Sequence, residues 1–227
     1  MAIVKKYKSA AEEVKEHIPG LFTVTFSSNK KFVYNPGQFL HLALDEYDGI
    51  GQWPESRCFS MQSNPDERNV TITYSVKGTF TKRMSELLIS GKQVWLKMPY
   101  GDIFDRGHSL NNCVFLAGGS GVTPFLSLFT YRTFAEYVNP VLYLGLRSSE
   151  YNVFSAEIET AKKINDSFTV NYVYQDREGL IDIAQVLAEH SESVYFISGP
   201  PIMIKNFKIA LLNGGVAENR ILTDDWE

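Results

Sequence analysis

The sequence predicts two domains: an antiparallel β-barrel over residues 1–108, followed by an α/β domain with a parallel sheet over residues 109–227. Two observations predict this division. The first half contains short apolar or alternating runs between turn signals, which is typical of antiparallel strands. The second half alternates strand-like with helix-like runs, which is typical of a parallel sheet covered by helices. No repeat, low-complexity tract or Pro/Ser-rich linker separates the halves.

The predicted barrel strands share short length and turn residues at their ends. They are Leu21–Phe26, Phe39–Leu44, Arg57–Gln62, Val70–Val76 and Val94–Met98. The breakers between them are Pro36-Gly37, Asp48-Gly49, Asn64-Pro65 and Tyr100-Gly101. Many short strands with regular turns indicate a barrel or a sandwich, and we expect the barrel.

A helix is expected within this half at Phe80–Ser90, because Met84, Leu87 and Leu88 share a helical face and Gly91 follows. The segment Gly78–Thr81 stands where a strand passes into this helix. Free backbone N–H groups and the positive end of the helix dipole would face an anion at that point.

The second half supplies nine segments in regular alternation. They are Cys113–Ala117, Thr123–Tyr137, Val141–Leu146, Val153–Ile164, Phe168–Tyr174, Ile181–His190, Val194–Ser198, Ile202–Leu212 and Arg220–Thr223. This order predicts a five-stranded parallel sheet with helices on both faces.

Composition excludes several functional classes. The net charge of −4 and the lack of long like-charge blocks argue against a nucleic-acid partner. Nowhere do about 18 apolar residues follow one another, so no membrane span is expected. The stretch from Met1 to Lys8 lacks an apolar run of signal-peptide length, and we therefore expect a cytoplasmic protein.

The two cysteines, Cys58 and Cys113, are too few for a four-cysteine iron–sulfur or zinc site within one chain. We expect no bound metal, and an iron–sulfur centre would belong to a partner protein. Both cysteines stand in apolar strand-like runs, which favours reduced core thiols over a catalytic or disulfide role.

A glycine-rich turn, Gly118–Pro124, connects a predicted strand with a predicted helix. Its glycines would let the backbone approach a diphosphate, while Thr123 could cap the helix and Pro124 suits its first turn. Such a turn is also common as a purely structural element. Pro124 replaces the third glycine of the dinucleotide fingerprint Gly-x-Gly-x-x-Gly.

This replacement resembles the ferredoxin-NADP reductase family, whose nicotinamide domain opens with Gly-x-Gly-x-x-Pro. Six segments resemble the family's motifs, in the family's order, namely Asn35–Phe39, Arg57–Ser60, Gly78–Thr81, Pro99–Phe104, Gly119–Pro124 and Ser198–Met203. The resemblance covers nearly the whole chain and implies a flavin-binding barrel followed by a nucleotide-binding α/β domain.

The resemblance implies that Arg57 pairs with the flavin diphosphate, that Phe59 packs against the flavin, and that the Ser60 hydroxyl lies near flavin N5. Phe59 replaces the family's tyrosine and so lacks its hydroxyl. The structural alternatives are a surface salt bridge for Arg57, simple core packing for Phe59, and a strand serine bonded to the backbone for Ser60. Because strand residues alternate, Arg57 and Phe59 share one face and Ser60 the other. Either a local bend or the span of the flavin itself must let all three reach the cofactor.

The remaining expected cofactor contacts also come from the resemblance. For the flavin diphosphate they are Gly78, Thr79, Phe80 and Thr81, and for the nicotinamide coenzyme Gly119, Gly121, Thr123, Pro124, Arg147, Gly199, Pro200 and Met203. Arginines like Arg147 also occur in relatives that use NADH, so coenzyme preference stays open.

Ser198 replaces a cysteine that most relatives place beside the hydride path, and Trp226 is the candidate aromatic cover of the flavin. With Ser60 they form the expected catalytic set. The alternatives are a strand-end turn residue for Ser198 and simple surface packing for Trp226.

The resemblance implies an NAD(P)H-dependent flavoprotein reductase that uses FAD, with NADPH or NADH as co-substrate. The acceptor is expected to be a ferredoxin, a flavodoxin, an oxygenase component or a small molecule such as free flavin. The alternatives are a flavin-carrying electron-transfer subunit of a larger complex, with little NAD(P)H activity of its own, and a nucleotide-binding sensor.

Overall fold

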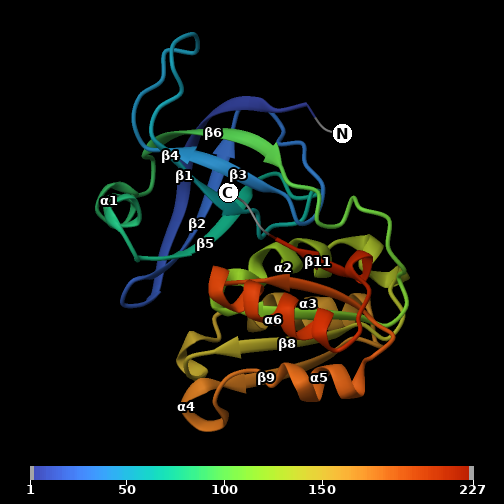
Figure 1. Cartoon of the computed structure of the whole chain (residues 1–227). Coiled ribbons are helices and arrows are strands. Elements are labelled where there is room, and N and C mark those ends of the chain that lie inside the picture. Colours follow the sequence, from blue (N-terminus) through green and yellow to red (C-terminus); the bar gives the residue numbers. More distant parts are fainter. Residues whose placement is uncertain (1–2, 225–227) are drawn as a thin grey trace. The chain divides into compact units, whose positions relative to one another are not determined.

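The structure is a computed structural model that describes residues 3–224. The chain forms two compact units that divide between Gly101 and Asp102, earlier than the division at residue 108 expected from sequence. The difference arises from the connecting segment, because Ile103 belongs to the core of the second unit and Phe104 packs against it. Figure 1 colours the chain along its sequence, from blue at the N-terminal end of the first unit to red in the second unit.

The first unit is an antiparallel sheet with the order β4-β3-β6-β1-β2-β5. The strands are β1 (Lys5–Ile18), β2 (Leu21–Ser28), β3 (Phe39–Ala43), β4 (Ser56–Ser60), β5 (Val70–Ser75) and β6 (Gln93–Tyr100). Beyond β4, Gln62 N donates to Thr71 O at 2.8 Å, which joins the two edges of the sheet. The sheet therefore nearly closes on itself, and the predicted antiparallel barrel is confirmed.

Strand β1 is absent from the sequence-based prediction, although it pairs with both β2 and β6. Its first part alternates as a strand should, with Tyr7, Ser9 and Ala11 buried. The pairing then shifts register between Ala11 and Glu13, which breaks the alternation. The Lys, Glu and Ala residues that fill this strand favour helices.

Helix α1 (Thr79–Leu87) follows β5 and is the green coil labelled in Figure 1. It packs Phe80 and Met84 into the barrel core, together with Leu88 beyond its end. Leu87, expected on the same face, is instead 40% exposed. The helix thus presents a narrower apolar face than its sequence indicates, and it ends before Ser90.

The second unit contains the predicted five-stranded parallel sheet, with the order β11-β10-β7-β8-β9. The strands are β7 (Cys113–Gly118), β8 (Val141–Leu146), β9 (Thr169–Tyr174), β10 (Val194–Ser198) and β11 (Ile221–Thr223). Alternate residues of each central strand face opposite cores. On β7, Phe115 lies in one core and Leu116 in the other.

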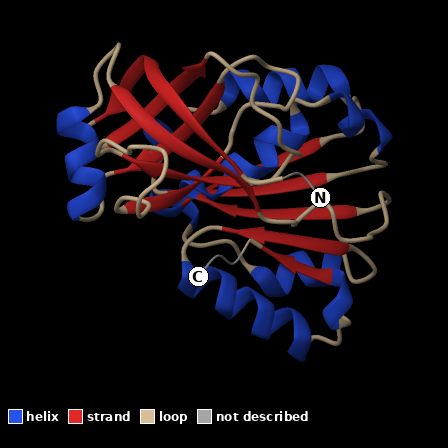
Figure 2. Ribbon diagram, turned by 90° about the horizontal axis from the view of Figure 1, so that it is seen from above, coloured by secondary structure: helices blue, strands red, loops and turns tan. Residues whose placement is uncertain are grey.

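Helices cover both faces of this sheet, as Figure 2 shows. They are α2 (Thr123–Phe129), α3 (Ser155–Ile164), α5 (Ile183–Glu189) and α6 (Pro201–Asn213), while the short, exposed helix α4 (Gln175–Glu178) follows the end of β9. Helix α2 was expected to reach Tyr137 but ends at Phe129, and a separate 3₁₀ turn occupies Arg132–Glu136. Within residues 3–224, no helix has both the length and the apolarity needed to cross a bilayer.

Candidate functional site

The glycine-rich turn lies at the carboxyl end of β7 and passes through a 3₁₀ turn, Gly119–Val122, into α2. A Cβ atom on Gly121 would lie 2.5 Å from Gly199 Cα and 2.5 Å from Ser198 O. Real Cβ atoms do not approach backbone that closely, so only glycine fits. The turn is therefore pressed against the segment that follows β10.

The same two segments meet at Gly118. A Cβ atom there would lie 2.7 Å from Met203 Sδ and 2.9 Å from Pro200 Cδ. Strands β7 and β10 are neighbours in the sheet, with Ala117 opposite Ser198. The predicted nicotinamide residues Gly121, Gly199, Pro200 and Met203 thus come together at the carboxyl edge, where parallel sheets bind ligands.

The start of α2 differs from the expected cap. Thr123 lies within the helix rather than before it, and Val122 is the capping residue. The Thr123 hydroxyl donates to Ser120 O at 2.8 Å, so it closes the preceding turn instead of accepting from helix N–H groups. The 3₁₀ turn runs directly into α2, which leaves no extended residue to act as a cap. Pro124 stands in the first turn, as expected.

Ser198 is 3% exposed, and its hydroxyl donates to Asp224 Oδ2 at 3.1 Å. The Asp224 backbone N–H also donates to Ile197 O at 2.9 Å, which holds the residue beside β10. Sequence reasoning did not predict the contact between Asp224 and Ser198, because α6 and β11 separate these residues along the chain. Trp226, the expected flavin cover, lies outside the described residues.

Arg147 follows β8 at the same carboxyl edge. Its guanidinium lies 5.6 Å from the centre of the Tyr151 ring. Its carbonyl accepts from Asp176 N, at the end of neighbouring β9, at 3.1 Å. Arg177 lies in the same way over Tyr174, at 5.5 Å. Two arginines therefore stand at adjoining strand ends, and Arg177 was not singled out from the sequence.

In the first unit, the side chain of Arg57 lies at the start of α1. The Arg57 guanidinium is 5.3 Å from the centre of the Phe80 ring. It pairs with Glu55 at 3.1 Å, and its side chain is 55% exposed. The expected phosphate ligand is thus on the surface and engaged in an ion pair.

The Gly78–Thr81 segment forms a compact helix start. The Thr81 hydroxyl accepts from Lys77 N at 2.9 Å and from Gly78 N at 3.0 Å. The N–H groups of the first helical turn have no acceptor within the helix itself. This first turn contains no acidic residue. A phosphate group would therefore meet donors and a favourable dipole here.

Strand β4 keeps the predicted alternation. Arg57 pairs with Leu42 and Phe59 with Leu40, both core residues, whereas Ser60 pairs with Phe39. Ser60 is 7% exposed and lies on the opposite face from Arg57 and Phe59. The bend that would bring Ser60 to the same ligand is not evident in β4. Its place beside a flavin stays a prediction.

The barrel core contains a buried tyrosine beside Phe59. Tyr74 is 2% exposed and meets Phe59 edge to face, with ring centres 6.1 Å apart. Within residues 3–224, its hydroxyl has no hydrogen-bond partner, and burial raises its pKa. Buried hydroxyls are rarely left unpaired, so a ligand that offers an acceptor beside Phe59 would suit this position.

The Asn35–Phe39 turn is fixed by Gln38, which is 4% exposed. Its Oε1 accepts from Asn35 N at 2.7 Å, and its Nε2 donates to Gly101 O at 2.8 Å. Gly101 has φ +88°, and a Cβ atom there would lie 3.0 Å from the Phe39 ring. This glutamine therefore ties the start of β3 to the end of the neighbouring strand β6.

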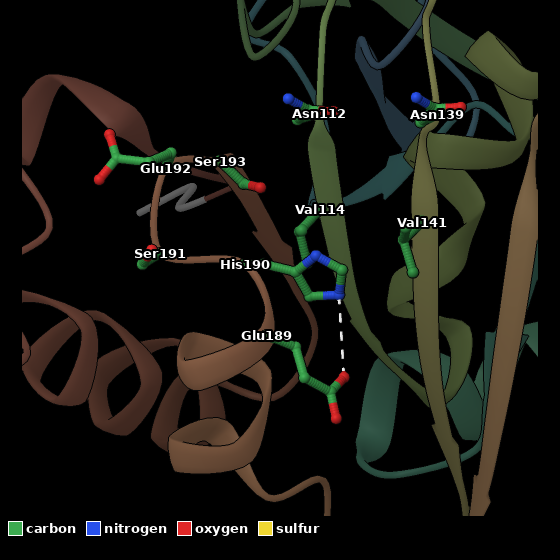
Figure 3. Close-up of a pocket in the computed structure, with 9 residues that line it drawn as sticks. All are labelled: Asn112, Val114, Asn139, Val141, Glu189, His190, Ser191, Glu192 and Ser193. Carbon is green, nitrogen blue, oxygen red and sulfur yellow. Dashed lines mark ion pairs between the residues drawn. The ribbon is translucent and has the colours of Figure 1, made fainter.

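A pocket of about 410 Å³ lies at the other edge of the parallel sheet. Figure 3 shows His190 and Glu189 at its wall, and Asn112 near the start of β7. Tyr143 donates to Glu189 Oε2 at 2.9 Å and lies 3.0 Å from His190 Nε2. The pocket is at the amino ends of the strands, so it is separate from the glycine turn.

The second unit matches the family model for the oxidoreductase NAD-binding domain over residues 115–208. The chain is 24% identical to the phenol hydroxylase P5 protein of Acinetobacter pittii, covering 98% of this chain and 66% of that protein. It is also 24% identical to the ferredoxin reductase component of 3-ketosteroid-9-alpha-monooxygenase from Rhodococcus rhodochrous, covering 97% and 64%. It therefore spans about two thirds of the length of these relatives.

Among solved structures, the fold matches a ferredoxin NADP⁺ reductase from Neisseria gonorrhoeae with bound FAD and NADP. The TM-score is 0.79 with 20% identity, and the match covers 99% of each chain. The order of barrel and parallel sheet agrees with this likeness. By its fold the chain is similar to this reductase, and its second unit contains an oxidoreductase NAD-binding domain.

Proposed function

We propose that this chain is an NAD(P)H-dependent flavoprotein reductase that uses FAD and passes electrons on to an acceptor. Two groups of residues, one in each unit, support the proposal. Arg57 lies over Phe80 at the start of α1, where a flavin diphosphate would bind. Gly121 lies against Gly199 at the sheet edge, where a nicotinamide dinucleotide would bind. Bound FAD would supply the ring that accepts hydride.

In the barrel, the protein would bind the doubly charged diphosphate and the flat ring of the flavin. Arg57 would make charge-assisted hydrogen bonds to the diphosphate, aided by N–H groups of Thr79 and Phe80. Phe59 would offer an apolar face to the ring, and Tyr74 an unpaired hydroxyl. Ser60 is proposed at the ring's reacting edge, by resemblance.

In the second unit, the backbone would do most of the binding. Gly119 and Gly121 let a diphosphate approach the turn before Thr123 and Pro124, while Pro200 and Met203 line the facing segment. Ser198 would stand beside the nicotinamide, with its hydroxyl oriented by Asp224. Arg147 would reach the ribose or its 2′-phosphate.

The proposed acceptor is an oxygenase component or a ferredoxin. Two relatives of this chain, over nearly its whole length, are named as a phenol hydroxylase protein and as a ferredoxin reductase component. Because the chain spans about two thirds of those relatives, a second candidate is a flavin-carrying subunit that receives electrons from a partner protein.

Anaerobic titration separates these candidates. The purified protein should show oxidised flavin bands near roughly 370 and roughly 450 nm, which belong to the cofactor. Adding NADH or NADPH should bleach them rapidly if the chain is a reductase. A flavin-loaded protein that bleaches only on addition of a reduced partner would favour the subunit. Absence of FAD binding would contradict both.

Coenzyme preference can be read from Arg147. If its guanidinium binds the 2′-phosphate, Arg147→Ala should raise KM for NADPH by about tenfold while changing KM for NADH little. An equal increase in KM for NADPH and NADH would mean that Arg147 binds a part of the molecule that both coenzymes share. We further propose a cytoplasmic location, which the two free thiols, Cys58 and Cys113, support.

A further inference from the structure

The carboxylate of Glu55 joins two arginines on the barrel surface. Its Oε1 lies 3.1 Å from Arg57 Nη2, and its Oε2 lies 3.2 Å from Arg83 Nη1. Arg83 also pairs with Asp45 at 2.7 Å. Two guanidinium groups, which would repel each other if left unpaired, are thus held around a single carboxylate group.

This cluster lies beside the start of α1. Phe80 and Arg83 are three residues apart on the helix and therefore share a face. Arg57 lies over the Phe80 ring on that same face. An anion in the position of the Glu55 carboxylate would meet both guanidinium groups beside a helix start that carries no acidic residue.

A diphosphate suits this position better than a carboxylate does. It carries two charges, and its oxygens match the fork of the guanidinium group, as those of a carboxylate do. We infer that Glu55 occupies the place of the flavin diphosphate and competes with it, and that Arg83 is the second cation that binds the diphosphate. The inference rests on the proposed flavin site of the barrel.

The competition makes the flavin exchangeable. The four charged side chains are between 33% and 55% exposed, and ion pairs in such positions contribute little to stability. The diphosphate can therefore displace Glu55 readily, and Glu55 can return to the arginines as the flavin leaves. Flavin affinity then depends on Glu55, which lies outside the Arg57–Ser60 motif.

Glu55→Gln tests the competition directly. We expect the dissociation constant for FAD, measured by quenching of flavin fluorescence, to fall about tenfold, because a negative charge beside a dianion is removed. The dissociation rate should fall in parallel. Riboflavin, which carries no phosphate, should bind with unchanged affinity. Glu46→Gln removes the same charge from an exposed position in the same loop and should change neither affinity.

Arg83→Met tests the second cation. It should weaken FAD binding about tenfold and leave riboflavin binding unchanged, because only the diphosphate contact is lost. Unchanged FAD affinity in Glu55→Gln, or an equal change for riboflavin, would overturn the inference while the wild-type protein still bound FAD. Failure of the wild-type protein to bind FAD would instead overturn the proposed function.

Discussion

The two candidate sites are built from different parts of the chain. In the second unit, backbone meets backbone, and Gly121 leaves no room for a single added carbon beside Gly199. In the first unit, charged side chains meet one another on the surface, and Arg57 is paired with Glu55. A site formed by packed backbone is fixed before a ligand arrives, whereas a site formed by exposed side chains must rearrange. We therefore expect the two sites to respond differently to substitution.

The largest effect is expected at Gly121. Its Cβ atom in Gly121→Ala would meet backbone at 2.5 Å, so the two segments must move apart. Displacement on this scale should lower kcat/KM for NAD(P)H by about 100-fold, while flavin content stays normal. The control is Gly107→Ala in the same unit, where an added Cβ meets nothing within 4 Å. Loss of flavin in Gly121→Ala would contradict the separation of the two sites.

A smaller effect is expected from Arg57→Ala, because other groups can still bind the flavin. Loss of one charge-assisted contact, about 1.5–3 kcal/mol, should weaken FAD binding by about 10- to 100-fold. Flavin content after dialysis measures this, and circular dichroism should show an unchanged fold. Arg68→Ala provides a control arginine in the same unit. Full flavin occupancy in Arg57→Ala would mean that the guanidinium does not bind the diphosphate.

A third effect concerns the hydroxyl that Asp224 orients. Ser198→Ala removes the 3.1 Å hydrogen bond without adding bulk. If this hydroxyl positions the nicotinamide, the rate of flavin reduction in stopped-flow measurements should fall about tenfold, with little change in coenzyme affinity. Asp224→Asn should show part of the same loss. Equal rates in all three proteins would leave Ser198 with a packing role.

The smallest effect concerns the core of the second unit, where the buried thiol of Cys113 makes the free energy of unfolding depend on pH. Burial raises the pKa of the Cys113 thiol to about 12. Below about pH 8.5 the thiol is neutral in folded and unfolded chains alike; above it, only the unfolded chain ionises. The free energy of unfolding should therefore fall by about 1 kcal/mol per pH unit between pH 9 and 11 from this group. Urea titrations of Cys113→Ala should show a shallower fall, and identical pH slopes would contradict this assignment.

Sequence patterns predicted the parts of the fold that depend on regular alternation. The parallel sheet follows from apolar strands such as Val194–Ser198, all of whose residues are buried. Helix α2 was extended too far because all of its residues are buried, so helical periodicity cannot mark its end. Strand β1 was missed because its register shift and charged residues hide the alternation.

The candidate sites divide in a similar way. The glycine and proline positions could be singled out from sequence because few residues fit a crowded turn, and the structure brings Gly121 against Gly199. The roles of Glu55, Arg83 and Asp224 could not be read, because each depends on a contact between side chains that tertiary structure alone brings together. Charged residues are common on surfaces, so their presence in a sequence indicates little by itself.

Strand β1 also determines when the barrel can form. It lies between β6 and β2, with Lys5 opposite Met98 and Ala10 opposite Gln93. Nearly the whole first unit must be synthesised before this central strand finds its second neighbour. Pairing across so long a loop is slow to form, because chain entropy is lost before the contacts are gained. During synthesis, the exposed edge of the β1–β2 hairpin would therefore be the part of the nascent chain most open to chaperones and to misassociation.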